Sequence, residues 1–143
     1  MAYLAGLFDG EGCISIGQHR QVRRKRGCMN QLWVTVNSSD EWVCQTFKMA
    51  FGGSVYTYIS PYRTRMWVWT IASKVALVCL ETLLPYLHLK RPQAEIAISF
   101  QKAKKSGKPL SDEEWALQEA QRLLVKDMKK RIKVDKTGDE NGA

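Results

Sequence analysis

The stretch LAGLFDGEG, residues 4–12, joins an apolar segment to two carboxylates that stand between glycines. Its small and apolar residues predict a short helix over 2–9, and Gly10 and Gly12 are typical of a helix end. Carboxylates at this end are repelled by the partial negative charge of the last helical carbonyls. A cation bound there would relieve the repulsion. The stretch therefore raises the question of what its carboxylates face.

Two pairs of strand-like segments follow this helix. In residues 31–37, Leu32, Val34 and Val36 alternate with more polar residues, which predicts a strand with one buried face. The predicted elements are a helix at 2–9, strands at 13–18 and 31–37, a helix from an Asp40 N-cap to Phe51, strands at 54–60 and 66–71, a helix from a Ser73 cap to Pro85, and helices at 92–105 and 112–132.

This order predicts an α+β fold, in which a four-stranded antiparallel sheet carries helices on one face. The length favours a single domain, which we place at residues 1–134. Residues 135–143 have almost no apolar content and predict a disordered tail.

The charges of the chain are distributed unevenly. The 143 residues carry a formal net charge of +8, yet only four acids occur before residue 81. Residues 12–39 contain five Arg or Lys and no acid. Such a one-sided surface favours a polyanionic partner, with nucleic acid as the first choice. Composition alone leaves open a soluble protein that is merely basic.

The sheet face opposite the apolar one is polar and aromatic, and the predicted strands contain no acid. This composition suits the major groove of double-stranded DNA, where polar side chains pair with base edges and turn residues contact phosphates. A neutral surface, or a face covered by another protein, is the alternative. The predicted DNA-binding residues are Ser15, Gly17, His19, Gln21, Arg23, Arg24, Lys25, Arg26, Gln31, Trp33, Thr35, Asn37, Tyr56, Tyr58, Arg63, Arg65, Val68 and Thr70.

Other classes of protein are disfavoured. The four cysteines form no CxxC pair and the two histidines offer no metal spacing, which argues against a zinc site or a disulfide framework. No apolar run is long enough to span a membrane. We expect a soluble intracellular protein with no small-molecule substrate, and the sequence does not distinguish a prokaryotic cytoplasm from an organelle.

Glu11 is a candidate metal ligand, because carboxylate oxygens suit Mg²⁺, which takes one or two carboxylates together with substrate phosphates. The helix before it carries small residues on one stripe, at Ala2, Gly6 and Gly10, with Ala5 beside them. Such a stripe permits close helix packing, either inside the monomer or against a second copy. In the second case two Glu11 carboxylates meet at the two-fold axis.

LAGLFDGEG resembles the signature of the LAGLIDADG homing endonucleases, through Leu4-Ala5-Gly6-Leu7, Asp9, an acid at 11 and Gly12. FGGSVY and LLPYLHLKRPQAE further along the chain resemble other landmarks of that family. The likeness covers about residues 2–100 and implies the αββαββα fold, with a saddle-shaped sheet and additional C-terminal helices.

A single motif implies a homodimer whose motif helices pack at the two-fold axis. The resemblance implies that Glu11 binds Mg²⁺, that the Gly10 backbone lies beside the metal, and that Mn²⁺ and Ca²⁺ are alternative occupants. It gives Asp9 a structural role at the helix end. The residues implied at the dimer interface are Ala2, Ala5, Gly6, Asp9 and Gly10.

The resemblance also suggests further catalytic residues. Lys90 stands where the family has a basic residue before the fourth helix, with Arg91 as the fallback. Asn37 and Ser38 stand where a polar residue ends the second strand, although the family often has Gln there.

Together these features predict a site-specific double-strand DNA endonuclease, encoded in an intron or similar mobile element. It would cut a long, roughly palindromic site by Mg²⁺-dependent hydrolysis and leave 3′ overhangs. Two alternatives on the same fold stay open: an RNA maturase that assists intron splicing, and a DNA-binding regulator that has lost cleavage.

Overall fold

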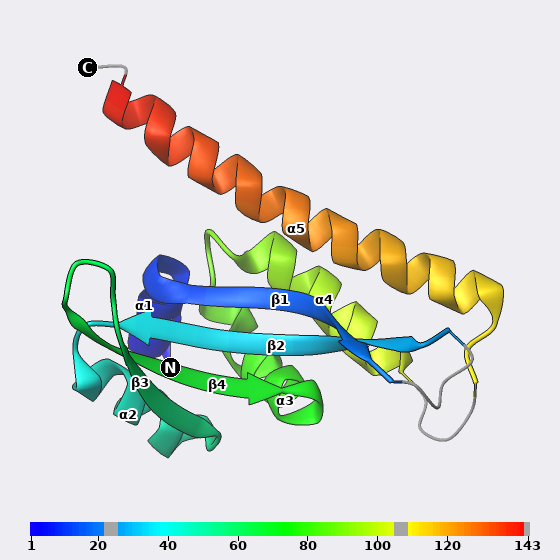
Figure 1. The fold of residues 1–143 in the computed structure, drawn as a ribbon, viewed down its shortest axis with the longest axis horizontal. Coiled ribbons are helices and arrows are strands. Elements are labelled where there is room, and N and C mark those ends of the chain that lie inside the picture. Colours follow the sequence, from blue (N-terminus) through cyan, green and yellow to red (C-terminus); the bar gives the residue numbers. More distant parts are fainter. Residues whose placement is uncertain (22–25, 105–108, 142–143) are drawn as a thin grey trace.

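The computed structural model describes residues 1–21, 26–104 and 109–141, with side chains up to Lys130. Figure 1 shows the arrangement of these elements. They are α1 (Ala2–Glu11), β1 (Gly12–Arg20), β2 (Cys28–Ser38), α2 (Glu41–Phe51), β3 (Ser54–Ile59), β4 (Arg65–Ala72), α3 (Ser73–Leu83), the 3₁₀ turn η1 (Leu84–Tyr86), α4 (Arg91–Ala103) and α5 (Asp112–Asn141). The predicted α+β order, with two additional C-terminal helices, is confirmed.

The four strands form one antiparallel sheet in the order β1-β2-β4-β3. The β1–β2 hairpin pairs Gly12 with Val36 and Arg20 with Cys28, and the β3–β4 hairpin pairs Ser54 with Thr70. The two hairpins join through β2 and β4, which leaves β1 and β3 as the edge strands.

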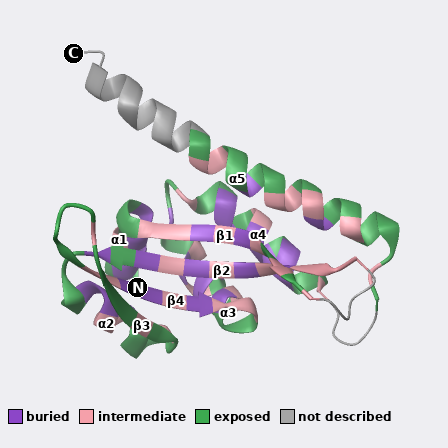
Figure 2. Ribbon diagram, viewed as in Figure 1, coloured by how far each residue is buried: buried purple, intermediate pink, exposed green. Residues whose placement is uncertain are grey.

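The sheet has a buried face and an open face, and Figure 2 shows the resulting alternation of burial along the strands. Helices α1 to α4 all pack against the sheet on the buried side. The core there includes Phe8 of α1, Phe47 of α2 and Trp69 of β4, and the rings of the last two stack with centroids 5.0 Å apart. The opposite side is called the open face below.

Helix α1 extends two residues beyond its predicted end and includes Gly10 and Glu11. It ends at Gly12, which turns the chain directly into β1. A Cβ atom at Gly12 would lie 2.3 Å from the Phe8 ring and 2.6 Å from the Phe8 carbonyl oxygen. Only glycine fits at this turn, because no L side chain tolerates such contacts.

Helix α2 begins as predicted, since the Asp40 side chain accepts a hydrogen bond of 3.0 Å from the Trp42 amide. The predicted Ser73 cap of α3 is wrong. Ser73 lies inside the helix at φ 53°, and its hydroxyl accepts a hydrogen bond from Gln31 instead of capping the helix.

Helix α5 continues to Asn141, so the backbone of 135–141, predicted to be a disordered tail, is helical. A single interior glycine destabilises a helix by only about 1 kcal/mol relative to alanine, and residues 112–141 contain no proline. Helix α5 therefore continues past Gly138. In Figure 1, α5 runs beside β1, on the side of that strand away from β2. None of the helices in the described ranges combines the length and the apolar character that a membrane span requires.

Candidate functional site

Glu11 is the last residue of α1, and its side chain is exposed at the point where the helix enters the sheet. Within the described part of the chain, no hydrogen bond or ion pair holds its carboxylate. The last carbonyl groups of α1 carry partial negative charge at the same place. The end of α1 therefore concentrates negative potential that a cation would relieve.

Asp9 differs from Glu11 because it is buried and used inside the chain. Its carboxylate accepts hydrogen bonds from the backbone amides of His88, at 2.8 Å, and Lys90, at 3.0 Å. These bonds fix the segment between η1 and α4 against α1. The geometry agrees with a structural role for Asp9. Because this side chain is buried, it is not available to contact a second copy of the chain.

The same contacts bring Lys90 to the end of α1. Its ammonium group donates a hydrogen bond of 2.6 Å to the Asp9 carbonyl oxygen, two residues before Glu11. A cation on the C-terminal carbonyls of a helix is electrostatically favourable. The structure thus places the Lys90 ammonium group in the last turn of α1, the helix that Glu11 ends. Arg91, the fallback, is instead paired with Glu95 at 3.1 Å, on the surface of α4.

A second cation reaches this region from α5, where the basic residues of the last helix had suggested either a phosphate-binding patch or a solvated face. Lys129 donates a hydrogen bond of 2.6 Å to the Ser15 hydroxyl, which lies 3.6 Å from the Cys13 sulfur. Burial raises the pKa of the Cys13 thiol. The Ser15 hydrogen bond and the charges of Lys129 and Lys90 outweigh this effect, so the pKa lies below its ordinary value. The spacing of Arg122, Lys126 and Lys129 on one helical face was the available signal.

Asn37 and Ser38, the two polar candidates at the end of β2, differ in position. Because Gly12 pairs with Val36, Asn37 lies at the level of the α1 end, on the open face. Its amide donates a hydrogen bond of 2.9 Å to the Tyr58 hydroxyl. Ser38 is buried, and its hydroxyl accepts a hydrogen bond from the Asp40 amide just before α2. Ser38 therefore has a structural role, and the strand alternation that turns it to the core explains the error.

The other strand residues predicted to contact DNA lie on the open face as expected from the alternation, with the exception of Arg65, which shares the side of β4 that carries Trp67 and Trp69. Several of them already hold one another. The Trp33 indole donates a hydrogen bond of 3.2 Å to the His19 ring, and Gln31 donates to Ser73 at 3.1 Å. Val68 is buried among its neighbours on this face, whereas Tyr56 is exposed. The residues of this set on the strands are Ser15, Gly17, His19, Gln31, Trp33, Thr35, Asn37, Tyr56, Tyr58, Arg65, Val68 and Thr70.

The predicted DNA-binding residues at the strand ends lie partly inside and partly outside the described residues. Arg23, Arg24 and Lys25 lie outside the described residues. Gln21 follows β1 at the hairpin end, where its amide donates to the Gly27 carbonyl, and Arg63 is exposed in the β3–β4 turn.

Arg26 is used within the chain, contrary to its predicted contact with phosphates. Its guanidinium donates to the Leu110 carbonyl at 3.0 Å, pairs with Asp112 and lies over the Trp115 ring. These contacts attach the β1–β2 hairpin to the start of α5, a long-range pairing that sequence spacing does not reveal.

One side of α1 remains exposed, and it carries Ala2, Gly6 and Gly10. A Cβ atom added at Gly6 or Gly10 would meet no other atom within 4 Å, so the monomer itself does not require these glycines. Ala5 and Asp9 do not belong to this surface, because both are buried in the chain's own fold. Their prediction as interface residues is therefore wrong: position 5 shares the core-facing side of the helix with its apolar neighbours.

An aromatic pair flanks this exposed side and was not predicted. Tyr3 of α1 and Trp42 of α2 are both exposed, and their ring centroids lie 6.2 Å apart. The exposed side of α1 therefore combines small residues with a large apolar neighbour, a composition that is unusual for a solvated helix surface.

The sequence profile of the LAGLIDADG endonucleases matches residues 4–106, which is more than two thirds of the chain. The chain belongs to the LAGLIDADG endonuclease family. The resemblance inferred from the motif at residues 4–12 is thus confirmed. No curated protein matches the chain.

Solved structures of LAGLIDADG homing endonucleases share the fold. I-CvuI, solved in complex with its target in the presence of Ca, is 26% identical, with a TM-score of 0.63; the match covers 71% of this chain and 64% of I-CvuI, slightly less than two thirds. The archaeal intron-encoded I-Vdi141I, complexed with DNA, is 14% identical over 88% of this chain and 81% of its own, with a TM-score of 0.74. I-TnaI is 17% identical over 92% and 94%, with a TM-score of 0.68.

The residues of this LAGLIDADG chain fit a divalent cation only in part. No three His, Cys, Asp or Glu side chains in the described ranges lie close enough to hold a metal together. One chain offers the exposed Glu11 carboxylate, next to the C-terminal carbonyls of α1. This donor set is hard and suits Mg²⁺ where further oxygen ligands come from phosphates or from a second copy.

Proposed function

We propose that this chain is a site-specific double-strand DNA endonuclease that acts as a homodimer and uses Mg²⁺. The observation that carries the proposal is the placement of Glu11. Its carboxylate is exposed at the end of α1, where Lys90 donates a hydrogen bond to the Asp9 carbonyl oxygen, and it borders an open sheet face whose strands contain no acid. Membership in the LAGLIDADG endonuclease family supports the same activity.

Each residue of the site has a role in this proposal. Glu11 holds the cation, beside the Gly10 backbone, and a bound Mg²⁺ supplies positive charge that stabilises the phosphate oxygens during hydrolysis. Lys90 holds its ammonium group at the end of α1, where it stabilises negative charge on the scissile phosphate. Asn37 is fixed by Tyr58 and lies at the same end of the sheet, where it orients a polar group of the substrate.

The open space beside the glycines of α1 is an independent observation that supports dimerisation through this helix. Interior glycines weaken an isolated helix by about 1 kcal/mol each, and neither Gly6 nor Gly10 is needed for packing within the monomer. A second helix at close range would use the space that both leave. Two-fold pairing brings two Glu11 carboxylates together, so each copy cuts one strand of a roughly palindromic site. The 3′ overhangs of the product are what the resemblance to the family implies.

The open face of the sheet is the surface that recognises the base sequence of the DNA target. Gln31, Thr35 and Thr70 present donors and acceptors that can reach base edges, while Arg63 and Arg65 stand at the β3–β4 turn, where phosphates would pass. Contacts such as that between Trp33 and His19 preorganise the surface before DNA binds.

The test is cleavage of a randomised duplex library with Mg²⁺, comparing the natural chain with Glu11→Gln. We expect the natural chain to cut one near-palindromic site, and the variant to bind that site without cutting it. A chelator should abolish cleavage by the natural chain. Because Glu11 is exposed, the variant should fold normally, which circular dichroism checks.

Other outcomes would redirect the assignment. If neither protein cuts any duplex but both bind DNA, the chain is a regulator. Selective binding of intron RNA without DNA cleavage would instead indicate a maturase. A monomer in sedimentation, with and without DNA, would contradict the paired Glu11 carboxylates.

A further inference from the structure

Helix α5 forms a wall along β1, the edge strand of the sheet. It contacts β1, β2 and α4, and Figure 1 shows it following β1 over much of the length of that strand. The sheet residues predicted to bind DNA therefore do not mark the limit of the open face on this side. The limit is the row of α5 side chains beyond β1.

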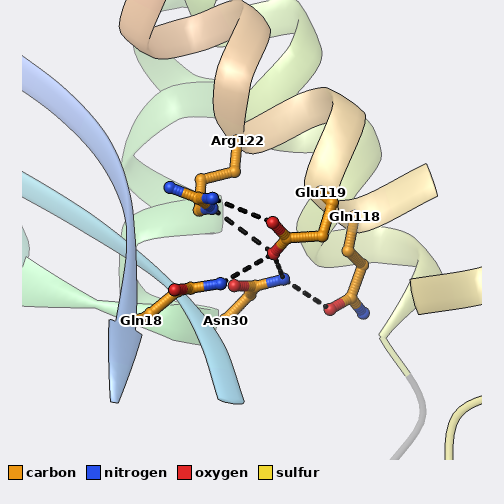
Figure 3. A network of polar contacts seen from close by, with 5 residues as sticks. All are labelled: Gln18, Asn30, Gln118, Glu119 and Arg122. Atoms are coloured by element: carbon orange, nitrogen blue, oxygen red, sulfur yellow. Dashed lines mark hydrogen bonds and ion pairs between the residues drawn. The ribbon is translucent and has the colours of Figure 1, made fainter. Parts of the chain in front are cut away.

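A polar network holds α5 in this position, as Figure 3 shows. Glu119 accepts hydrogen bonds from Gln18 of β1 at 2.8 Å and from Asn30 of β2 at 3.1 Å. It is also paired with Arg122 at 2.8 Å. The two hydrogen bonds from Gln18 and Asn30 tie one turn of the helix to two strands, and Arg122 of the same helix orients the Glu119 carboxylate. At the start of α5, Arg26 adds an attachment to Asp112.

A groove of about 260 Å³ lies between β1 and α5, just beyond this network. Its floor on the sheet side is the segment 15–18, and its helix side includes Arg122, Lys126 and Lys129. No carboxylate is among its lining residues. Glu119 compensates Arg122, so the charge offered to a ligand comes mainly from the two lysines.

The two lysines are placed differently within the groove. Lys126 is exposed, whereas Lys129 reaches across the edge strand to the Ser15 hydroxyl at 2.6 Å. They are three residues apart, so both project from the same side of α5. Two ammonium groups beside hydroxyl and amide donors match the spaced oxygens of consecutive backbone phosphates.

We propose that the groove between β1 and α5 binds the phosphodiester backbone of the duplex that lies on the open face. The inference rests on the DNA-binding function proposed above and extends its contact surface by one strand of backbone in each half-site. The contact is independent of base sequence, so it contributes affinity and orientation while the sheet supplies specificity.

The experiment measures duplex binding as a function of salt, without divalent metal so that no cleavage occurs. The groove variant is Lys126→Gln with Lys129→Gln, which removes both charges but keeps a donor for Ser15. The matched control is Lys48→Gln with Lys102→Gln, which removes two charges from α2 and α4, on the other side of the sheet. Thermal unfolding checks that all three proteins are equally folded.

We expect the magnitude of the slope of log K against log salt to fall by about 4 in the groove variant, because each of the two copies loses two charges, and to stay unchanged in the control. Hydroxyl-radical footprints should lose one protected backbone segment in each half-site. Equal slopes and footprints for the groove variant and the natural chain would overturn this inference while leaving the endonuclease proposal intact. Absence of salt-dependent duplex binding by the natural chain would overturn both.

Discussion

Helices α1 and α5 both contact β1, but they are held there by different chemistry. Helix α1 buries Leu4, Ala5 and Phe8 in the main core. Helix α5 contributes Val125 as its buried apolar residue among the described side chains, and its polar links to the strands are hydrogen bonds.

The difference separates two ways of building a functional surface. Apolar burial fixes α1 firmly from one side, so its other side can carry residues that stabilise nothing within the monomer, such as Gly6, Gly10 and Glu11. Helix α5 is positioned mainly by directional hydrogen bonds and less by apolar burial. These hydrogen bonds hold its lysines at defined positions. The first arrangement suits a catalytic end at a close interface, and the second suits a contact with phosphates.

The largest expected effect tests this contrast directly by truncating one buried side chain on each helix. Phe8→Ala should lower the free energy of unfolding by about 3–5 kcal/mol, because it leaves a cavity in the core. Val125→Ala should cost about 1.5 kcal/mol, since it removes only two buried carbon groups from α5. Urea unfolding measures both. Equal losses would show that α5 is as much a core element as α1.

The second prediction compares the two sides of α1 through glycine. Gly12→Ala should destabilise the chain by about 1–3 kcal/mol, since its Cβ would overlap Phe8. Gly6→Ala meets open space and should raise the stability of the monomer by up to about 1 kcal/mol. The same Gly6→Ala change should weaken dimerisation, measured by sedimentation. A stabilised monomer with unchanged self-association would exclude Gly6 from the interface.

Most of the fold could be predicted because its signals are local. Alternation in residues 31–37 and the Asp40 cap report on neighbouring residues only, and both are confirmed. The helical limits were less predictable. Gly10 was expected to help end α1, yet the helix continues to Glu11, where the contact between Gly12 and Phe8 decides the turn.

The site was predictable only where the motif itself carried it. The resemblance pointed to Glu11 and Lys90, and in the structure the Lys90 ammonium group donates to the Asp9 carbonyl oxygen in the last turn of α1, which Glu11 ends. The use of Arg26 at the start of α5, and the reach of Lys129 to Ser15, depend on contacts between residues about 85 to 115 positions apart. No local pattern encodes which partner a charged side chain finds, so Arg26 was predicted to contact DNA instead.

The smallest expected effect concerns the polar attachment of α5. Hydrogen bonds and the ion pair with Arg122 hold the pKa of Glu119 below its ordinary value of 4.5, in spite of partial burial, so its contribution is fully present above that value. It should be lost as the pH falls through the lowered pKa in the folded state, because the unfolded chain then binds the proton more readily. Glu119→Gln should therefore cost about 1 kcal/mol at neutral pH and clearly less at roughly pH 3, measured by urea unfolding against the natural chain. The other carboxyl groups titrate in both proteins and cancel in the difference. A cost independent of pH would show that the Glu119 carboxylate charge does not help to hold α5 against the sheet.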